Sequence, residues 1–162
     1  MLRPDAYADS LSSVPLDDLA ASGVRGIIVD LDNTLVGYGE DACSPHDAAW
    51  VARAIGSGFR VVLVSNNFSD RVRRIGEALG VPAIPNALKP LPTGFLRALA
   101  LLGTGRRATV VVGDQLFTDV LGAKLCGLRS ILTHPLVARD WHGTRVLRFF
   151  ERLVLGPRRP GA

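Results

Sequence analysis

The feature that most constrains the fold is a series of short apolar runs that no polar residue interrupts. Five runs are expected to form strands, at 25–30, 60–65, 82–84 (the weakest), 108–113 and 129–133. Four stretches between them have the period of a helix, at 46–56, 69–79, 92–102 and 116–126. Strands that are apolar on both sides are typical of a parallel sheet covered by helices on both faces. The alternation therefore predicts an α/β fold, with three Rossmann-like layers around a central parallel sheet.

Helix-capping residues support these boundaries. Gly80, Gly103 and Gly127 stand where helix C-caps are expected, and Ser69 and Pro92 stand where helices begin. With 162 residues, the chain has the size of one domain. We expect this domain to span 1–156 and to be followed by a disordered tail at 157–162.

The positive charge is concentrated at the C-terminal end. The chain has a formal net charge of +4, and from residue 139 onward six arginines stand against two acidic residues, so this segment accounts for the excess. Residues 144–155 place four apolar side chains on one helical face and three arginines on the other, which predicts a basic amphipathic helix. This indicates one cationic edge rather than a uniformly basic surface, and nucleic acid is not expected as a partner.

Several features indicate a cytoplasmic protein. Cys43 and Cys126 have neither metal-ligand nor C-x-x-C spacing, which favours reduced thiols. The first residues contain acids where a signal peptide needs an uninterrupted apolar stretch, and the longest aliphatic runs are far too short to span a bilayer. We expect peripheral contact with the inner membrane face through the C-terminal arginines.

Polar residues of chemical interest follow the strong strands or arrive by a neighbouring loop. They are Asp30, Asp32, Ser65, Lys89, Asp114 and Asp119. The carboxyl ends of parallel strands meet at one edge of the sheet, so these side chains are expected to share a site. Clustered aspartates raise one another's pKa values unless a cation holds them ionised, and hard oxygen ligands suit Mg²⁺.

The same set of residues favours phosphate chemistry. A metal, a lysine and a serine around one point form a clamp for phosphate oxygens. An aspartate beside a bound phosphoryl group can attack phosphorus and form an aspartyl-phosphate. A second aspartate, two residues on, can protonate the leaving oxygen and later activate water.

Four segments resemble the motifs of the haloacid dehalogenase (HAD) superfamily of phosphatases, in this order and at these spacings: DLDNTL (30–35), VSNN (64–67), LKP (88–90) and GDQLFTD (113–119). Three longer segments are similar to the YqeG-type, class IIIA branch: RPDAYADS (3–10), SNNFSDRV (65–72) and GDQLFTDVLGAKLCG (113–127). That branch is similar to phosphatidylglycerophosphate phosphatases. The resemblance covers nearly the whole chain and implies a HAD fold.

The resemblance implies a role for each motif residue. Asp30 would be the nucleophile and Asp32 the general acid and base. Ser65 and Lys89 would bind the transferring phosphoryl group, supported by Thr34 and Asn66. Asp114 would hold Mg²⁺ together with the Asp30 side chain and the Asp32 backbone carbonyl, and Asp119 would orient Lys89 or a metal-bound water.

Arg71 leaves two interpretations open. With Arg73 and Arg74 it falls in the first turns of a predicted helix, where the ordinary expectation is a solvated face. The alternative is that Arg71 contacts a second phosphate or the headgroup of the substrate, since it follows the Ser65 loop closely.

The lengths of the segments between the motifs leave no room for an inserted cap domain. An open, capless site suits a substrate whose bulk stays outside, and the leading hypothesis is Mg²⁺-dependent removal of phosphate from phosphatidylglycerophosphate, a phospholipid headgroup. A capless phosphatase of soluble metabolites, nucleotides or polynucleotide ends is the first alternative. A phosphate- or Mg²⁺-binding module without turnover is the second.

Overall fold

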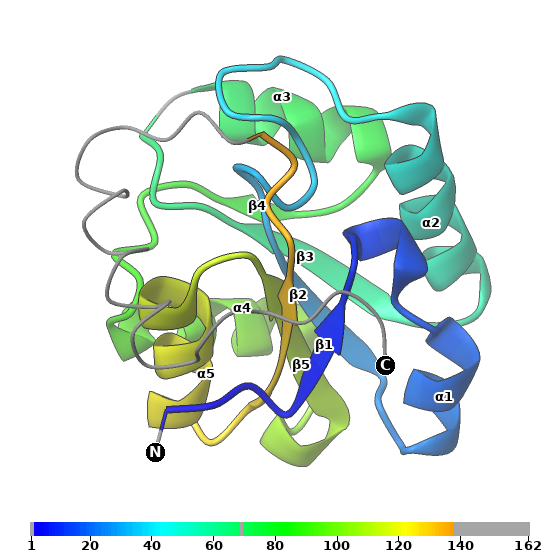
Figure 1. The fold of residues 1–162 in the computed structure, drawn as a ribbon, viewed down its shortest axis with the longest axis vertical. Helices are drawn as coiled ribbons and strands as arrows, with labels where there is room; N and C mark the ends of the chain where they lie inside the picture. Colours follow the sequence, from blue (N-terminus) through cyan, green and yellow to red (C-terminus); the bar gives the residue numbers. More distant parts are fainter. Residues whose placement is uncertain (1, 69, 138–162) are drawn as a thin grey trace.

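The computed structural model describes residues 2–68 and 70–137 and contains a six-stranded sheet (Figure 1). Its strands are β1 (Ala6–Ala8), β2 (Gly26–Asp30), β3 (Arg60–Val64), β4 (Ala83–Ile84), β5 (Thr109–Gly113) and β6 (Arg129–Thr133). The order across the sheet is β1-β6-β5-β2-β3-β4, and every neighbouring pair is parallel. The predicted parallel α/β fold is confirmed, and β2 lies in the middle with β5 on one side and β3 on the other.

Helices cover both faces of the sheet. The α-helices are α1 (Leu16–Ala21), α2 (Pro45–Gly56), α3 (Asp70–Leu79), α4 (Pro92–Leu102) and α5 (Leu121–Leu125). Short 3-10 helices occur at η1 (Leu11–Ser13) and η2 (Arg106–Ala108), and a π-helix, η3 (Leu116–Val120), leads into α5. The core is correspondingly divided: α1, α2 and α3 pack on one face, and α4 and α5 on the other (Figure 1).

The helix boundaries follow the residues that predicted them. Gly80, Gly103 and Gly127 have φ values of 69°, 60° and 67°, the left-handed conformation that ends a helix. Pro92 is the first residue of α4, where its missing N–H costs no hydrogen bond. Ser69, the predicted helix 144–155 and the predicted tail 157–162 lie outside the described residues.

The N-terminal part of the sheet was not predicted. Strand β1 is a three-residue edge strand that pairs with β6, with Ala6 opposite Ile131. The Asp5 side chain reinforces this pairing, because its Oδ2 accepts hydrogen bonds from the Ser130 backbone N–H (2.8 Å) and hydroxyl (3.1 Å). Helix α1 is also short, and it places Leu19 in the core.

The connections near the middle of the sheet are short. In the described part of the chain, α2 is the helix between β2 and β3, and α3 is the helix between β3 and β4. Both helices pack directly against the sheet, so the expected absence of an inserted cap holds for these residues. Within residues 2–68 and 70–137, no helix is long and apolar enough to cross a membrane.

Candidate active site

Asp30 ends β2 at the centre of the carboxyl edge and meets Lys89 from the loop after β4. The Lys89 ammonium donates to Asp30 Oδ1, and also to Asp119 Oδ1 at 2.6 Å. Lys89 is 7% exposed and Asp119 is 1% exposed, so this pairing is made out of water. Residues separated by 59 positions in the chain are therefore brought into direct contact, as expected for parallel strand ends.

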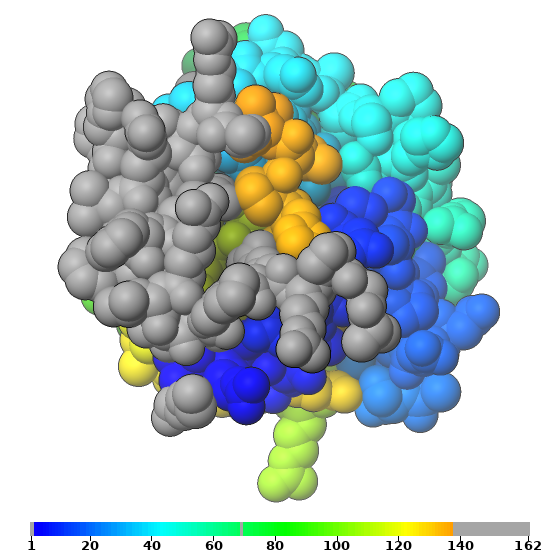
Figure 2. All heavy atoms as spheres, in the orientation of Figure 1, coloured from blue at the N-terminus to red at the C-terminus, as the bar shows by residue number. Residues whose placement is uncertain are grey.

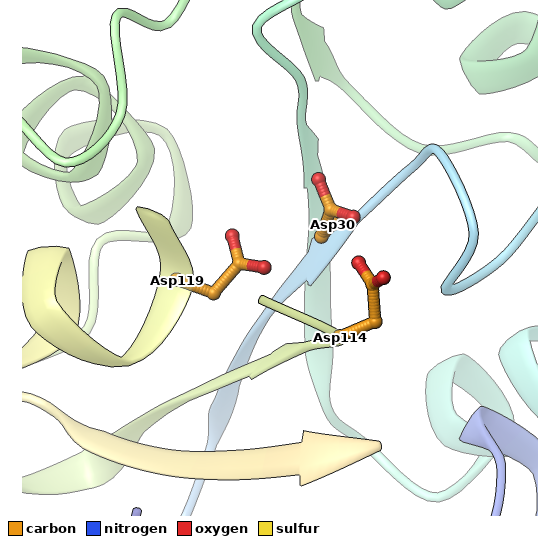
Figure 3. A group of neighbouring side chains, drawn as sticks. All are labelled: Asp30, Asp114 and Asp119. Carbon is orange, nitrogen blue, oxygen red and sulfur yellow. The ribbon is translucent and has the colours of Figure 1, made fainter. Parts of the chain in front are cut away.

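Asp30, Asp114 and Asp119 form a buried acidic cluster (Figure 3). One carboxylate oxygen from each lies within 4.8 Å of the other two, and Figure 3 shows the three groups converging from β2, the end of β5 and η3. Three carboxylates against one lysine leave a formal excess of two negative charges (3 − 1) in a buried site. A divalent cation would neutralise this excess, and the all-oxygen donor set suits a hard ion.

The pKa shifts of Asp30 and Lys89 also indicate that the cluster needs a further positive charge. Burial raises the pKa of Asp30 well above its ordinary value, Lys89 opposes that rise, and Asp119 and Asp114 add to it. Burial by itself would lower the pKa of Lys89, but the carboxylates of Asp119 and Asp30 outweigh it and raise that pKa. Lys89 is thus firmly a cation, while an ionised Asp30 requires more positive charge than Lys89 supplies.

Thr34 joins the two expected ligand residues. Its hydroxyl lies 3.1 Å from Asp30 Oδ2 and 3.4 Å from Asp114 Oδ1, in position to donate to either. It comes from the turn after β2, where Asn33 has a φ of 65°, a conformation that asparagine tolerates better than most residues. The turn thus places Thr34 directly beside the carboxylate of the preceding strand end.

Asp32 points to a different set of partners. Its Oδ2 accepts a hydrogen bond from the Ser65 hydroxyl at 3.2 Å, and its Oδ1 accepts one from Arg71 Nη1 at 2.7 Å. The Asp32 side chain is 18% exposed, whereas that of Asp30 is 5% exposed. The two aspartates of the motif therefore belong to separate hydrogen-bond groups, one around Lys89 and one around Arg71.

The expected solvated position of Arg71 is wrong. Arg71 is 8% exposed, and its guanidinium also donates from Nε to the Glu40 carbonyl at 2.5 Å and from Nη2 to the Gly37 carbonyl at 3.4 Å. The loop after β2, drawn in cyan, runs beside α3 at this point (Figure 1). Arg71 thus joins this loop to Asp32, while Arg73 and Arg74 are exposed as expected.

Asn66 holds the backbone of Lys89. Its Oδ1 accepts from the Lys89 backbone N–H at 2.6 Å, and its Nδ2 donates to the Lys89 carbonyl at 2.9 Å. The neighbouring Ser65 hydroxyl accepts from the Asn67 backbone N–H at 3.0 Å, which fixes the Ser65 side chain at the edge of β3. These residues of the second motif therefore position the lysine of the third.

Gly113 and Gln115 position Asp119, and the sequence interpretation missed both. The Gln115 backbone N–H donates to Asp119 Oδ2 at 3.1 Å, and the π-helical turn of η3 carries Asp119 back toward β5. A Cβ atom at Gly113 would lie 2.3 Å from Asp119 Oδ2, so only glycine leaves room for this carboxylate. The Gly-Asp pair in the fourth motif was the available signal, since a glycine at a strand end often marks a close approach.

The fold is that of a HAD-type hydrolase. Residues 87–137 match the family model described as HAD-hydrolase-like. Two solved structures share the fold. The cobalt-bound deoxy-D-mannose-octulosonate 8-phosphate phosphatase of Haemophilus influenzae is 16% identical with a TM-score of 0.57 over 78% of this chain and 75% of that one. A hypothetical protein of Xanthomonas campestris is 22% identical with a TM-score of 0.59 over 85% and 79%.

A closer relationship appears in the sequence. The chain is 38% identical over 152 residues to the probable phosphatase YqeG of Bacillus subtilis (strain 168), which covers 94% of this chain and 88% of that protein. The chain therefore belongs to the YqeG family of HAD-type phosphatases.

Proposed function

We propose that this phosphatase removes phosphate from phosphatidylglycerophosphate through an aspartyl-phosphate intermediate, with Asp30 as the nucleophile. The observation that carries the chemistry is the buried contact of Asp30 with Lys89 beside Asp114 and Asp119. A carboxylate fixed at a rigid strand end, next to a buried cation, is placed to meet a phosphoryl group.

In the first step, an Asp30 carboxylate oxygen attacks phosphorus. The new O–P bond forms as the bond between phosphorus and the leaving oxygen breaks, and Asp32 gives its proton to that oxygen. The Lys89 ammonium and the Ser65 hydroxyl donate to the phosphoryl oxygens as charge moves onto them. Asn66 acts through Lys89, whose backbone it holds from both sides.

In the second step, Asp32 takes a proton from a water molecule, and the resulting hydroxide attacks the phosphorus of the aspartyl-phosphate. The bond between phosphorus and the Asp30 oxygen breaks, which restores the carboxylate and releases inorganic phosphate. Asp32 returns to its protonated form and is ready for the next cycle. Arg71 holds Asp32 at the side of the site, separate from the Lys89 group.

We propose that the acidic cluster binds a divalent cation and that this cation is Mg²⁺. Asp30 and Asp114 would hold it, together with the backbone carbonyl of Asp32. When bound, the ion neutralises charge on the phosphate and keeps Asp30 ionised. Asp119, which already accepts from Lys89 and Gln115, orients the lysine.

Two features support the phospholipid substrate: the described connections contain no inserted cap domain, and the chain carries an excess of positive charge. The described connections hold no inserted cap over the carboxyl edge, which suits a substrate whose bulk stays outside the site. The excess of arginines from residue 139 onward suits an anionic surface at the cytoplasmic face of a membrane.

Phosphate release from vesicles tests this function. We expect the full chain with Mg²⁺ to release phosphate from phosphatidylglycerophosphate in vesicles at least about tenfold faster than from soluble sugar phosphates at equal concentration, because binding energy from the lipid contributes to catalysis. A chelator and Asp30→Asn should each stop the reaction, whereas Asp70→Asn, on an exposed side chain, should not. Equal or faster turnover of a soluble phosphate rejects the lipid assignment, and persistent activity of Asp30→Asn rejects the mechanism.

A further inference from the structure

Exposed apolar side chains gather at the edge of the sheet that carries the site. In the described part of the chain, five large ones lie on the loops that follow β2, β3, β4 and β6: Tyr38, Phe68, Leu88, Leu91 and Leu136. Their exposed fractions run from 42% to 77%. We refer to these five residues as the apolar rim. Since the strands are parallel, all four loops open on the carboxyl edge.

Two members of the rim flank the turn of the first motif. The Tyr38 backbone N–H donates to Asn33 Oδ1 at 3.3 Å, and the Leu136 backbone N–H donates to the Asn33 carbonyl at 3.0 Å. Asn33 lies between Asp32 and Thr34 in the chain. Figure 2 shows the segment after β6, in orange, reaching the surface of the molecule.

The other three members lie on the lysine side of the site. The Asn86 backbone N–H donates to the Asn67 carbonyl at 2.9 Å, which ties the loop that carries Phe68 to the loop that carries Leu88. Leu88 directly precedes Lys89, and the Leu91 backbone N–H donates to the Leu88 carbonyl at 2.9 Å. The apolar rim thus borders the catalytic groups on two sides.

Comparable side chains elsewhere provide a reference. Ile55, Leu101 and Leu125 are also exposed, and each lies at the C-terminal end of a helix that leads back to the start of the next strand. They therefore occupy the opposite edge of the sheet, where Ile55 and Leu101 line one cavity with Arg60. Exposed apolar side chains are ordinary when they occur singly, but five on the loops around one edge of the sheet indicate a contact surface.

We propose that the apolar rim binds to an anionic phospholipid surface during catalysis. This inference builds on the proposed function. Anything that covers the rim also covers the site between its two sides. A second protein would close the site, whereas a phospholipid surface covers the rim and presents a phosphate to Lys89 at the same time.

The charge of the chain fits this occupant. The loop that carries Tyr38 also carries the acidic Glu40 and Asp41, so the attraction to anionic lipid must come from elsewhere. The sequence supplies it directly after the rim: from residue 139, three positions beyond Leu136, six arginines stand against two acids. Apolar side chains in contact with acyl chains and arginines in contact with headgroups are the two components of interfacial binding.

Vesicle sedimentation of the full chain tests the proposal. The vesicles contain phosphatidylcholine with or without phosphatidylglycerol, and no phosphatidylglycerophosphate. The rim variant is Phe68→Ser with Leu91→Ser, and the matched control is Leu101→Ser with Leu125→Ser, which removes apolar area from the opposite edge. Hydrolysis of p-nitrophenyl phosphate by each variant shows that the site is intact.

We expect the rim variant to bind anionic vesicles at least about tenfold more weakly than the parent chain, since each lost side chain removes apolar area from the interface. The control variant should bind within about twofold of the parent. Equal binding by the two variants overturns the proposal. A parent chain that ignores vesicles but forms a dimer that the rim variant loses also overturns it, in favour of an interface between copies.

The two proposals fail separately. Rim-dependent binding to vesicles, without release of phosphate from phosphatidylglycerophosphate, keeps the lipid-binding surface and rejects the substrate. Release of phosphate from phosphatidylglycerophosphate at the same rate by the parent and the rim variant, in vesicles and in detergent micelles alike, keeps the substrate and rejects the surface.

Discussion

Asp30 and Asp32 lie two residues apart at the end of one strand, yet their surroundings differ. Asp30 is buried against Lys89, Thr34 and two further aspartates, and its pKa is raised by burial. Asp32 is more exposed and is held by Arg71 and Ser65. The two carboxylates of one motif therefore have different neighbours: Asp30 lies beside a buried lysine, and Asp32 is paired with an arginine and a serine hydroxyl.

The largest effect is expected at Asp30. Asp30→Asn removes the nucleophile, and hydrolysis should fall at least about 10⁵-fold for good and poor leaving groups alike. Steady-state rates with p-nitrophenyl phosphate and with an alkyl phosphate measure this directly. A loss confined to the alkyl phosphate would contradict the assignment of Asp30 as nucleophile.

The rate loss caused by replacing Asp32 should depend on the leaving group of the substrate. Asp32→Asn removes the proton donor, so cleavage of an alkyl phosphate should slow by about 10²- to 10⁴-fold, with a smaller loss for p-nitrophenyl phosphate, whose leaving group needs no proton. The ratio of the two rates in each variant is the measurement. An equal ratio of the two rates in the Asp30→Asn and Asp32→Asn variants would contradict the assignment of different catalytic roles to Asp30 and Asp32.

Arg71 should have a moderate effect through Asp32. Arg71→Gln frees the Asp32 carboxylate and the loop at Gly37 and Glu40, and kcat should fall about tenfold with little change in KM. Arg71→Lys keeps the charge but not all of the contacts, so it should recover part of this loss. The exposed Arg73→Gln is the control. A raised KM at unchanged kcat would instead indicate that Arg71 contacts substrate.

The smallest effect is expected on the folding stability of the chain, measured with and without Mg²⁺. The raised pKa of Asp30 means that the folded chain keeps a proton that the unfolded chain has released. Stability in chelator should therefore fall as pH rises from the ordinary aspartate value through the raised one. Mg²⁺ at about 100 times its Kd should add about 2.7 kcal/mol, or roughly 5–10 °C in Tm.

Thermal melts across pH, with and without Mg²⁺, check that expectation. Asp114→Asn should lose most of the shift in Tm because it removes a ligand, and Asp70→Asn should keep it. If Asp114→Asn keeps the full shift in Tm on addition of Mg²⁺, the ion binds at another site.

Strands with continuous apolar runs were predictable, and edge elements were not. Strands β2, β3 and β5 are covered on both faces, so their composition indicates their structure directly. Strand β1 has three residues, two of them exposed, and its partner β6 is more than 120 positions away. No local pattern encodes such a pairing, because its hydrogen bonds form only when the rest of the sheet exists.

The same distinction applies to the site. Contacts between strand ends, such as Asp30 with Lys89, follow from parallel topology and were expected. The inward position of Arg71 depends on the rotation of α3, which its composition leaves open. A signal existed, because Arg71 lies four residues before the buried Ile75 and so shares its helical face, whereas Arg73 does not.

Gly113 extends the set of residues on which the chemistry depends. It touches neither phosphate nor metal in the proposed mechanism, and it contributes no side chain. Yet the space that it leaves is occupied by Asp119, which in turn orients Lys89. Natural variation at position 113 should therefore be as restricted as at the charged positions. A count of the reactive groups alone underestimates how many positions selection keeps unchanged.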